Sequence, residues 1–427
     1  MPIATLFAVM GTMLVIGVPI GISICAGLLS VAMLYGTTTL AFIGQQLYSG
    51  LDSFPLMAVP CFMLAGSLME KGGISKRLVR VAEVFLGHQV GGYCAVTVVA
   101  CLFFGAISGS APATVAAIGG IMIPYMVEAG YDKPFATGLS AVAGSLGIII
   151  PPSIPFVVYG VSTNTSIADL FLSGFVPGII IGVALIAVAK YLCKKKGYKG
   201  SDHRFTWAEK WAAIKDAVWA IIMPVIILGG IYGGICTPTE AATVAIYYSI
   251  FVGFFIYKEM HIQDVLDILN DTASFVGAVM LAFAPAAAMG GVLSMLGVPA
   301  MVRTMLTSVS TDLNIIMLIV LVVLLIAGMI LDTMSSIVIL APIFYSALIP
   351  IGVDPIYLGC VMICALAIGF ITPPVAQNLF VASTMTGVPM HKVVKSAMPF
   401  IIAMLFCVLL IIFVPPLTTF LPNLFKG

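Results

Sequence analysis

Two polar interruptions of long apolar runs contain the residue types best suited to bind an ion or an organic anion. The first is Ser108-Gly109-Ser110-Ala111-Pro112, and the second lies within 328–336, where Asp332 and Thr333 interrupt apolar sequence. Hydroxyl oxygens suit Na⁺, a hard cation that prefers oxygen ligands. A half-helix beginning near Pro112 would present free N–H groups and a positive dipole end, which favours a carboxylate. Each interruption predicts a re-entrant hairpin whose tip reaches the middle of a membrane.

Two double prolines form a second pair of breaks. Gly147 precedes Pro151-Pro152 and Ser153, and Gly369 precedes Thr372-Pro373-Pro374. Proline lacks an amide donor and displaces the carbonyl four residues back, so free carbonyl oxygens near these breaks could coordinate Na⁺. Paired prolines could also simply kink two packed helices. Four breaks matched in two halves of the chain favour a substrate and ion site, because irregular backbone at membrane depth occurs where it lines a cavity or is buried.

Asp332 is the one carboxylate deep within an apolar run. Acids inside a membrane are costly and are functional by default, although a neutral, hydrogen-bonded structural aspartate is the alternative. An anionic substrate would add a second negative charge, so we expect two or more coupling Na⁺ ions. Glu240 differs, because Thr237-Pro238-Thr239-Glu240 fits a capping box at a helix start. We favour this structural role over a role in ion transport.

A repeat predicts how the breaks are positioned. The chain matches itself at an offset of 222 residues over roughly 103–178, so that Gly147 falls on Gly369 and Pro177 falls on Pro399. The expected fold is therefore an all-α polytopic membrane protein of two repeats, each with a re-entrant hairpin and a broken helix.

The expected boundaries follow from this repeat. Repeat 1 covers 1–178, with its hairpin at about 92–129 and its broken helix at about 134–168. A connecting helix and a basic cytoplasmic interfacial helix cover 179–219. Repeat 2 covers 220–399, with its hairpin at about 313–349 and its broken helix at about 356–390, and a C-terminal helix covers 400–427.

The basic residues predict the orientation. Eight of the eighteen Lys and Arg residues lie between Lys190 and Lys215, which marks this connector as cytoplasmic. With one hairpin per repeat, sixteen basic residues face the cytoplasm, and the other two are Arg303 and Lys426. Equivalent positions of the two repeats then face opposite sides, so the repeats are expected to be inverted.

Composition excludes most other classes of protein. Of the 427 residues, 61% are hydrophobic and 8% charged, with a mean hydropathy of +1.20. A water-soluble chain needs more charge to cover its surface. An intramembrane enzyme would need a nucleophile–base pair or a metal cluster at depth, whereas the apolar core offers one Asp and no His. We therefore do not expect an enzyme.

Six segments carry a resemblance to a known family. They are Ser108-Gly109-Ser110, Gly130-Tyr131-Asp132, Gly147 through Pro155, Thr237 through Ala242, Ile371 through Pro374, and Asn378 through Ser383. With them the chain resembles, over nearly its whole length, the large membrane subunit of tripartite ATP-independent periplasmic (TRAP) transporters.

The resemblance implies more than composition does. A transport domain carrying both hairpins would move elevator-fashion against a scaffold in the bacterial inner membrane, with Na⁺ as the coupling ion. A periplasmic substrate-binding protein would deliver a small organic anion, and a small four-helix membrane subunit would complete the scaffold. This chain starts directly in the large subunit, so the small one is expected as a separate polypeptide. No nucleic-acid partner is expected.

The resemblance also implies a set of site residues. One Na⁺ site would use hydroxyl groups and backbone carbonyls of Ser108, Ser110, Gly147, Ile150 and Pro152. Its repeat-related partner would use Asp332 or Thr333 together with Gly369, Thr372 and Pro374. The substrate would touch Ser110, Ser153 and Asp332. This sequence has Ala111 where relatives have a further hydroxyl, so the contacts of the first tip need not transfer in full.

Two questions stay open at the level of sequence. A stand-alone Na⁺-coupled carrier or antiporter without a binding protein would explain everything except the family motifs. The substrate is either of the sialic acid type or a C4-dicarboxylate. The core has no Arg to clamp a second carboxylate, which favours a monocarboxylate such as a sialic acid.

Overall fold

The computed structural model describes residues 1–201 and 203–426, and over these residues it contains helices and no strand. Eight of its helices are long and apolar enough to cross a membrane. A ninth span would be formed by Leu40–Leu51 with Phe54–Lys71, which are bent by 54° at their junction. The chain is therefore a multi-pass membrane protein.

The first half begins with four helices and a short amphipathic one: α1 (Pro2–Val15), α2 (Ile20–Tyr35), α3 (Leu40–Leu51), α4 (Ala58–Lys71) and α5 (Ile74–Leu86). A helical hairpin follows, made of α6 (Gly92–Ser108) and α7 (Ala111–Glu128). The next helix is interrupted: α8 (Lys133–Gly144) continues into a 3₁₀ turn (Ser145–Ile148), and α9 (Ile154–Thr163) starts beyond the double proline. Helix α10 (Ile167–Lys196) closes this half.

The second half repeats the hairpin, the interrupted helix and the long helix that follows it. It opens with α11 (Trp207–Tyr232), α12 (Pro238–Phe251), α13 (Ile262–Met295) and α14 (Val298–Val309). The second hairpin consists of α15 (Leu313–Ile330) and α16 (Thr333–Leu348). The second interrupted helix consists of α17 (Pro355–Gly369) and α18 (Gln377–Thr386), and the chain ends with α19 (Met390–Phe413) and α20 (Pro416–Lys426).

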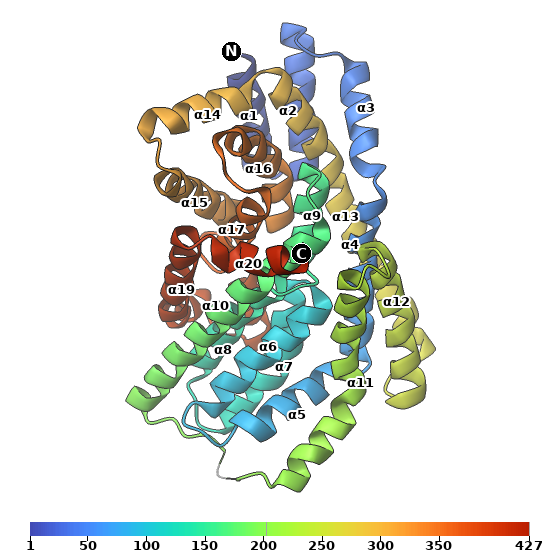
Figure 1. Ribbon diagram of the computed structural model, residues 1–427, viewed down its shortest axis with the longest axis vertical. Helices are drawn as coiled ribbons and strands as arrows, with labels where there is room; N and C mark the ends of the chain where they lie inside the picture. Colours follow the sequence, from blue (N-terminus) through green and yellow to red (C-terminus); the bar gives the residue numbers. More distant parts are fainter. Residues whose placement is uncertain (202, 427) are drawn as a thin grey trace.

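The helices pack in two groups that meet at the hairpins. Helices α2, α3 and α4 pack on α13, and α11 and α12 pack on each other beside α4 and α5. The hairpins and interrupted helices pack on α10 and α19. Figure 1 shows α3, α4, α11, α12 and α13 along one side of the molecule, with α6, α8, α10 and α19 on the other. The groups touch where α13 packs on α16 and where α5 and α4 pack on α6.

Three expected boundaries fall inside continuous helices. Helix α10 runs through 178, α11 continues from Trp207 through 219 to Tyr232, and α19 begins at Met390 rather than at 400. The basic connector is therefore not a separate interfacial helix, because its helical segment is the first part of α11. Each of these helices contains an internal proline, Pro177, Pro224 or Pro399. Prolines are tolerated inside membrane helices where neighbouring groups satisfy the freed backbone.

Candidate functional site

The first hairpin tip is a two-residue turn. Gly109 adopts the left-handed region (φ +60°), which glycine reaches without steric cost, and Ser110 is extended. The Thr114 N–H donates to the Ser110 carbonyl, and Pro112 has no N–H. Helix α7 therefore starts without a side-chain cap, and the N–H groups of Ala111 and Ala113 are left without a partner in the described chain.

Hydroxyl groups gather directly behind this tip. The Thr114 hydroxyl donates to the Ser110 carbonyl at 2.7 Å and lies 3.1 Å from the Ser108 hydroxyl oxygen. Both side chains are buried. The tip thus places two hydroxyl oxygens and one carbonyl oxygen in a small volume, which is a donor set suited to a hard cation.

The second tip is capped by its own carboxylate. Asp332 is the N-cap of α16, and its Oδ2 accepts the Ser335 N–H at 3.1 Å. Its Oδ1 accepts a hydrogen bond from the Ser335 hydroxyl group. A charged N-cap oxygen satisfies the free N–H groups of a helix start and complements the helix dipole.

The two double prolines pack against the two tips. Both Pro–Pro peptide bonds, Pro151-Pro152 and Pro373-Pro374, are cis. The Ile154 N–H donates to the Gly109 carbonyl at 3.3 Å, and the Val375 N–H donates to the Met329 carbonyl at 3.2 Å. Each broken helix is therefore tied by a backbone hydrogen bond to the hairpin of its own half.

Close packing at two glycines holds these parts together. A Cβ at position 147 would overlap the Thr114 hydroxyl oxygen and lie 2.8 Å from the Ser110 carbonyl oxygen. A Cβ at position 369 would lie 2.6 Å from backbone atoms of Gly328. Glycine is required at both positions because backbone and hydroxyl groups approach it directly.

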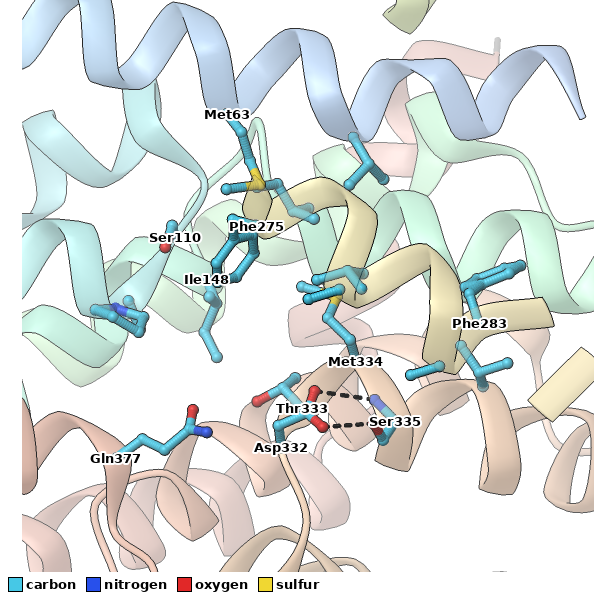
Figure 2. A pocket seen from close by; sticks show the side chains of 18 of the residues that line it. Met63, Ser110, Ile148, Phe275, Phe283, Asp332, Thr333, Met334, Ser335 and Gln377 are labelled. Carbon is cyan, nitrogen blue, oxygen red and sulfur yellow. Dashed lines mark hydrogen bonds between the residues drawn. The ribbon is translucent and has the colours of Figure 1, made fainter. Parts of the chain in front are cut away.

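A cavity of about 300 Å³ lies between the tips and the other group of helices (Figure 2). Four helices, α7, α9, α16 and α18, begin at residues in or beside its wall: Ala111, Ile154, Thr333 and Gln377. The polar wall also contains Ser110, Asp332 and Ser335. Helix starts favour negative charge. Among the residues that line the cavity, none is Lys, Arg or His, so positive potential comes from backbone N–H groups.

The opposite wall is apolar. Its largest side chains are Val59 and Met63 of α4 together with Phe275, Val279 and Phe283 of α13. Figure 2 shows the ring of Phe275 projecting into the cavity on the side of Ser110 and Ile148. The site is therefore two-sided, with polar groups and helix starts on one face and hydrocarbon on the other.

The residues predicted from sequence fall into three sets. Ser110, Asp332 and Thr333 line the cavity. Ser108 ends the first helix of the first hairpin, Gly147 and Pro152 pack against that hairpin, and Ile150 lies between them in the same break. Gly369 packs on the second hairpin at Gly328, and Thr372 and Pro374 lie in the break that follows it. Ser153 is fully buried, and its hydroxyl donates to the Ile148 carbonyl at 2.6 Å instead of facing the cavity. The structure therefore does not bring Ser153 to the expected substrate contact.

Sequence reasoning missed four polar residues. Thr114 and Ser336 are 222 residues apart and fully buried, each one turn into the second helix of a hairpin. The repeat offset alone would have paired them. Gln377 lines the cavity, and Asn378 is buried beside it in sequence. Both residues begin α18 just after the second double proline. Whether their side chains reach the cavity depends on how α18 packs, which the sequence does not show.

Orphaned oxygens at the second tip fit a cation. The hydroxyl oxygens of Thr333 and Ser336, in the first turn of α16 after the second tip, are buried without a hydrogen-bond partner in the described chain. Buried polar atoms normally have partners, so these two oxygens indicate ligands for a group that the chain itself does not supply. The residues present therefore fit a Na⁺ ion.

Glu240 lies outside this site and has the geometry of a capping box. Its Oε2 accepts the Thr237 N–H at 2.7 Å, and the Glu240 N–H donates back to the Thr237 hydroxyl at 3.3 Å. Its carboxylate is thus occupied at the start of α12.

Known proteins match the chain over almost its whole length. The family model described as "Tripartite ATP-independent periplasmic transporter, DctM component" matches residues 7–417. An isethionate TRAP transporter permease of Oleidesulfovibrio alaskensis is 41% identical over 98% of this chain, which spans 66% of that protein. A C4-dicarboxylate TRAP large permease of Pseudomonas aeruginosa is 38% identical, covering 92% of this chain and 91% of that protein. A sialic acid TRAP large permease of Vibrio cholerae is 33% identical, covering 100% and 99% respectively.

A solved structure shares the architecture. The Alcanivorax borkumensis YdaH transporter superposes with a TM-score of 0.63 at 14% identity, covering 87% of this chain and 88% of that one. This likeness concerns the fold alone. The family match and the relatives show that the chain belongs to the DctM family as the large membrane subunit of a TRAP transporter, and that it is a transport protein rather than an enzyme.

Proposed function

We propose that this chain imports a small organic anion across the bacterial inner membrane by coupling it to two or more Na⁺ ions. The observation that carries the proposal is the cavity, whose wall contains the uncapped start of α7 together with Ser110 and Asp332. The relatives are named for isethionate, C4-dicarboxylate and sialic acid, all of which are organic anions.

The residues that would hold Na⁺ lie at the two tips. Ser108, Thr114 and the Ser110 carbonyl supply oxygens at the first tip, and Thr333 with Ser336 supplies them at the second. Bound Na⁺ would supply the positive charge that the lining lacks. Ser110 and the α7 start then orient the anion, while the two double prolines hold the carbonyls of both breaks in place.

The two packed groups of helices support an elevator movement. The cavity lies at the seam between them, with its polar wall on the hairpins and its apolar wall on α4 and α13. A smooth hydrocarbon wall offers no hydrogen bonds that would hold the hairpins in one position. The two halves would be inverted repeats with the basic loops facing the cytoplasm.

Two partners complete the proposal: a periplasmic substrate-binding protein and a small four-helix membrane subunit as a separate chain. Large exposed apolar side chains on the first two helices and α3, such as Ile22, Met33, Leu34 and Tyr48, provide a surface for the small subunit or for lipid.

The test is uptake by proteoliposomes that contain this chain with its small subunit. Labelled isethionate, succinate and N-acetylneuraminate would each be offered with and without an inward Na⁺ gradient and the binding protein. Uptake that requires both the gradient and the binding protein supports the proposal. Na⁺-driven uptake without the binding protein would identify a stand-alone carrier, which is the alternative. Failure of every anion under every condition would overturn the transport assignment.

A further inference from the structure

We propose that the cavity selects a short organic monoanion, a carboxylate or sulfonate with a small apolar body, over dicarboxylates and polyhydroxylated sugar acids. This inference rests on the proposed function, because it concerns the substrate of the same cavity. Four observations about the walls carry it.

The first observation is that one of the two hairpin tips already holds a carboxylate of the chain, that of Asp332. Ser110 and Asp332 are equivalent under the 222-residue offset, and Ala113 is equivalent to Ser335. At the second tip, the Asp332 carboxylate accepts the Ser335 N–H. At the first tip, the equivalent Ala113 N–H has no partner in the described chain, because Ser110 leaves α7 uncapped. Of the two hairpin tips, the start of α16 is occupied by a carboxylate, and the start of α7 is free to receive an anionic group from the substrate.

The second observation is an unpartnered hydroxyl in the wall. Thr333 is 2% exposed, its hydroxyl oxygen has no hydrogen-bond partner in the described chain, and it lines the cavity. A buried polar atom of this kind indicates a bound group that completes it. The Thr333 hydroxyl is thus a second indication of a bound ligand or coupling ion, independent of the free helix start.

The third observation is the absence of Lys, Arg and His among the lining residues. An additional carboxylate would find no cationic side chain there, and Asp332 in the same wall would repel it. Burial of a charge without a partner is strongly unfavourable. A dicarboxylate therefore lacks the Arg or Lys that would clamp its second group.

The fourth observation is the composition and size of the scaffold wall. Met63, Phe275 and Phe283 offer no hydrogen bonds, so a sugar acid would leave several hydroxyl groups unpaired, each weakening binding by roughly tenfold. The cavity of about 300 Å³ is at the lower end of the range for ligand sites. A short apolar body fits both the volume and the hydrocarbon wall.

Phe275 is the residue that sets this selectivity. It comes from α13, projects into the cavity on the side of Ser110 and Ile148 (Figure 2), and is 55% exposed in the chain. Its replacement is therefore compatible with folding. Phe275→Asn adds hydrogen-bonding groups to the wall, whereas Phe275→Leu changes size and keeps the wall apolar.

The test measures Na⁺-dependent ligand binding by calorimetry, using the full chain with its small subunit in nanodiscs and no binding protein. The ligands are propionate, ethanesulfonate, succinate and N-acetylneuraminate. The expected result is that a monoanion binds at least tenfold more tightly than succinate or N-acetylneuraminate. Phe275→Asn should reduce the preference over N-acetylneuraminate about tenfold, and Phe275→Leu should leave it within about threefold of the wild type.

The outcomes separate this inference from the proposed function. Tightest Na⁺-dependent binding of succinate or N-acetylneuraminate would overturn the monoanion inference and leave anion import intact. Equal effects of Phe275→Asn and Phe275→Leu would show that the apolar character of Phe275 does not set the preference for ligands with few hydroxyl groups. If no ligand binds and the uptake assay also fails, both proposals are wrong.

Discussion

The carboxylate of Asp332 accepts hydrogen bonds from both the backbone N–H and the hydroxyl group of Ser335, three residues further along the chain. This pair closes the start of α16, and both residues also line the cavity. The Asp332 side chain therefore has two roles: it caps the start of α16, and it places a carboxylate in the wall of the cavity. Substitutions can separate the two, because asparagine caps a helix without carrying charge.

We expect Asp332→Asn to keep most of the stability of the protein and to change its Na⁺ dependence. Asp332→Ala should lower the free energy of unfolding by about 1 kcal/mol, because it removes the cap. The Asn variant should raise the half-saturating Na⁺ concentration about tenfold, or ~1.4 kcal/mol, because a charge near the cation is lost. Thermal unfolding and the Na⁺ dependence of uptake measure the two effects. A wild-type Na⁺ dependence in Asp332→Asn would contradict the electrostatic role.

Replacement of Thr114 should weaken Na⁺ binding at the first tip. Thr114→Val removes the hydroxyl group that lies 3.1 Å from Ser108 and preserves the shape of the side chain, whereas Thr114→Ser keeps the hydroxyl. We expect the Na⁺-induced rise in melting temperature to require about tenfold more Na⁺ in Thr114→Val, and to be near normal in Thr114→Ser. Equal responses of the two variants would show that the hydroxyl is not a ligand.

Alanine at either close-packed glycine should disrupt the breaks. Gly147→Ala would overlap Thr114, and Gly369→Ala would come within 2.6 Å of Gly328 backbone, so each should cost about 1–3 kcal/mol of stability and most of the uptake. Gly229 is the matched control, since a Cβ there meets nothing within 4 Å. Gly229→Ala should be neutral or slightly stabilising. Normal uptake by Gly147→Ala would rule out the proposed packing.

Substitution of Glu240 distinguishes a cap from a transported-ion ligand. Glutamine at this position can still accept from the Thr237 N–H, as a capping box requires. We expect Glu240→Gln to retain near-normal uptake and Glu240→Ala to lower the melting temperature slightly, because the reciprocal half of the capping box is lost. Loss of uptake in Glu240→Gln with a normal melting temperature would instead assign the charge a role in transport.

The ion pair between Asp132 and Lys196 predicts a pH dependence at the membrane edge. Hydrogen bonds with Tyr198 and Lys196 hold the pKa of Asp132 below its usual value. A depressed pKa stabilises the folded state above the unfolded value of about 3.9, and this contribution is lost as the pH falls through the lower folded pKa. Because the pair is exposed, the effect is about 0.2–1 kcal/mol.

The check is the melting temperature of wild type and Asp132→Asn between pH 7 and pH 3. The difference between them should be present at pH 7 and shrink as the pH falls below about 4. A difference that is constant over this range would show that the carboxylate charge is not what stabilises this edge.

Much of the local architecture could be predicted from the sequence. Ser108 through Pro112 and Asp332 interrupt apolar runs that are long enough to span a membrane, and the structure ends and restarts helices at both places. Backbone N–H and C=O groups in a membrane must find hydrogen-bond partners within the helix or in neighbouring protein. A short polar interruption of an apolar run therefore locates a helix break from local sequence alone. The double prolines act in the same local way, because they cannot donate the hydrogen bonds of a helix.

Tertiary structure alone decided which side chains meet at the site. Ser153 follows a predicted break, yet packing turns its hydroxyl to the Ile148 carbonyl. Phe275 lies 165 residues from Ser110 in the chain, and nothing in its local sequence marks it as the wall opposite that serine. The repeat, the breaks and the membrane class are determined by the sequence because each depends on neighbouring residues. The two-sided cavity depends on how distant helices pack, which is set by side-chain contacts that no local pattern contains.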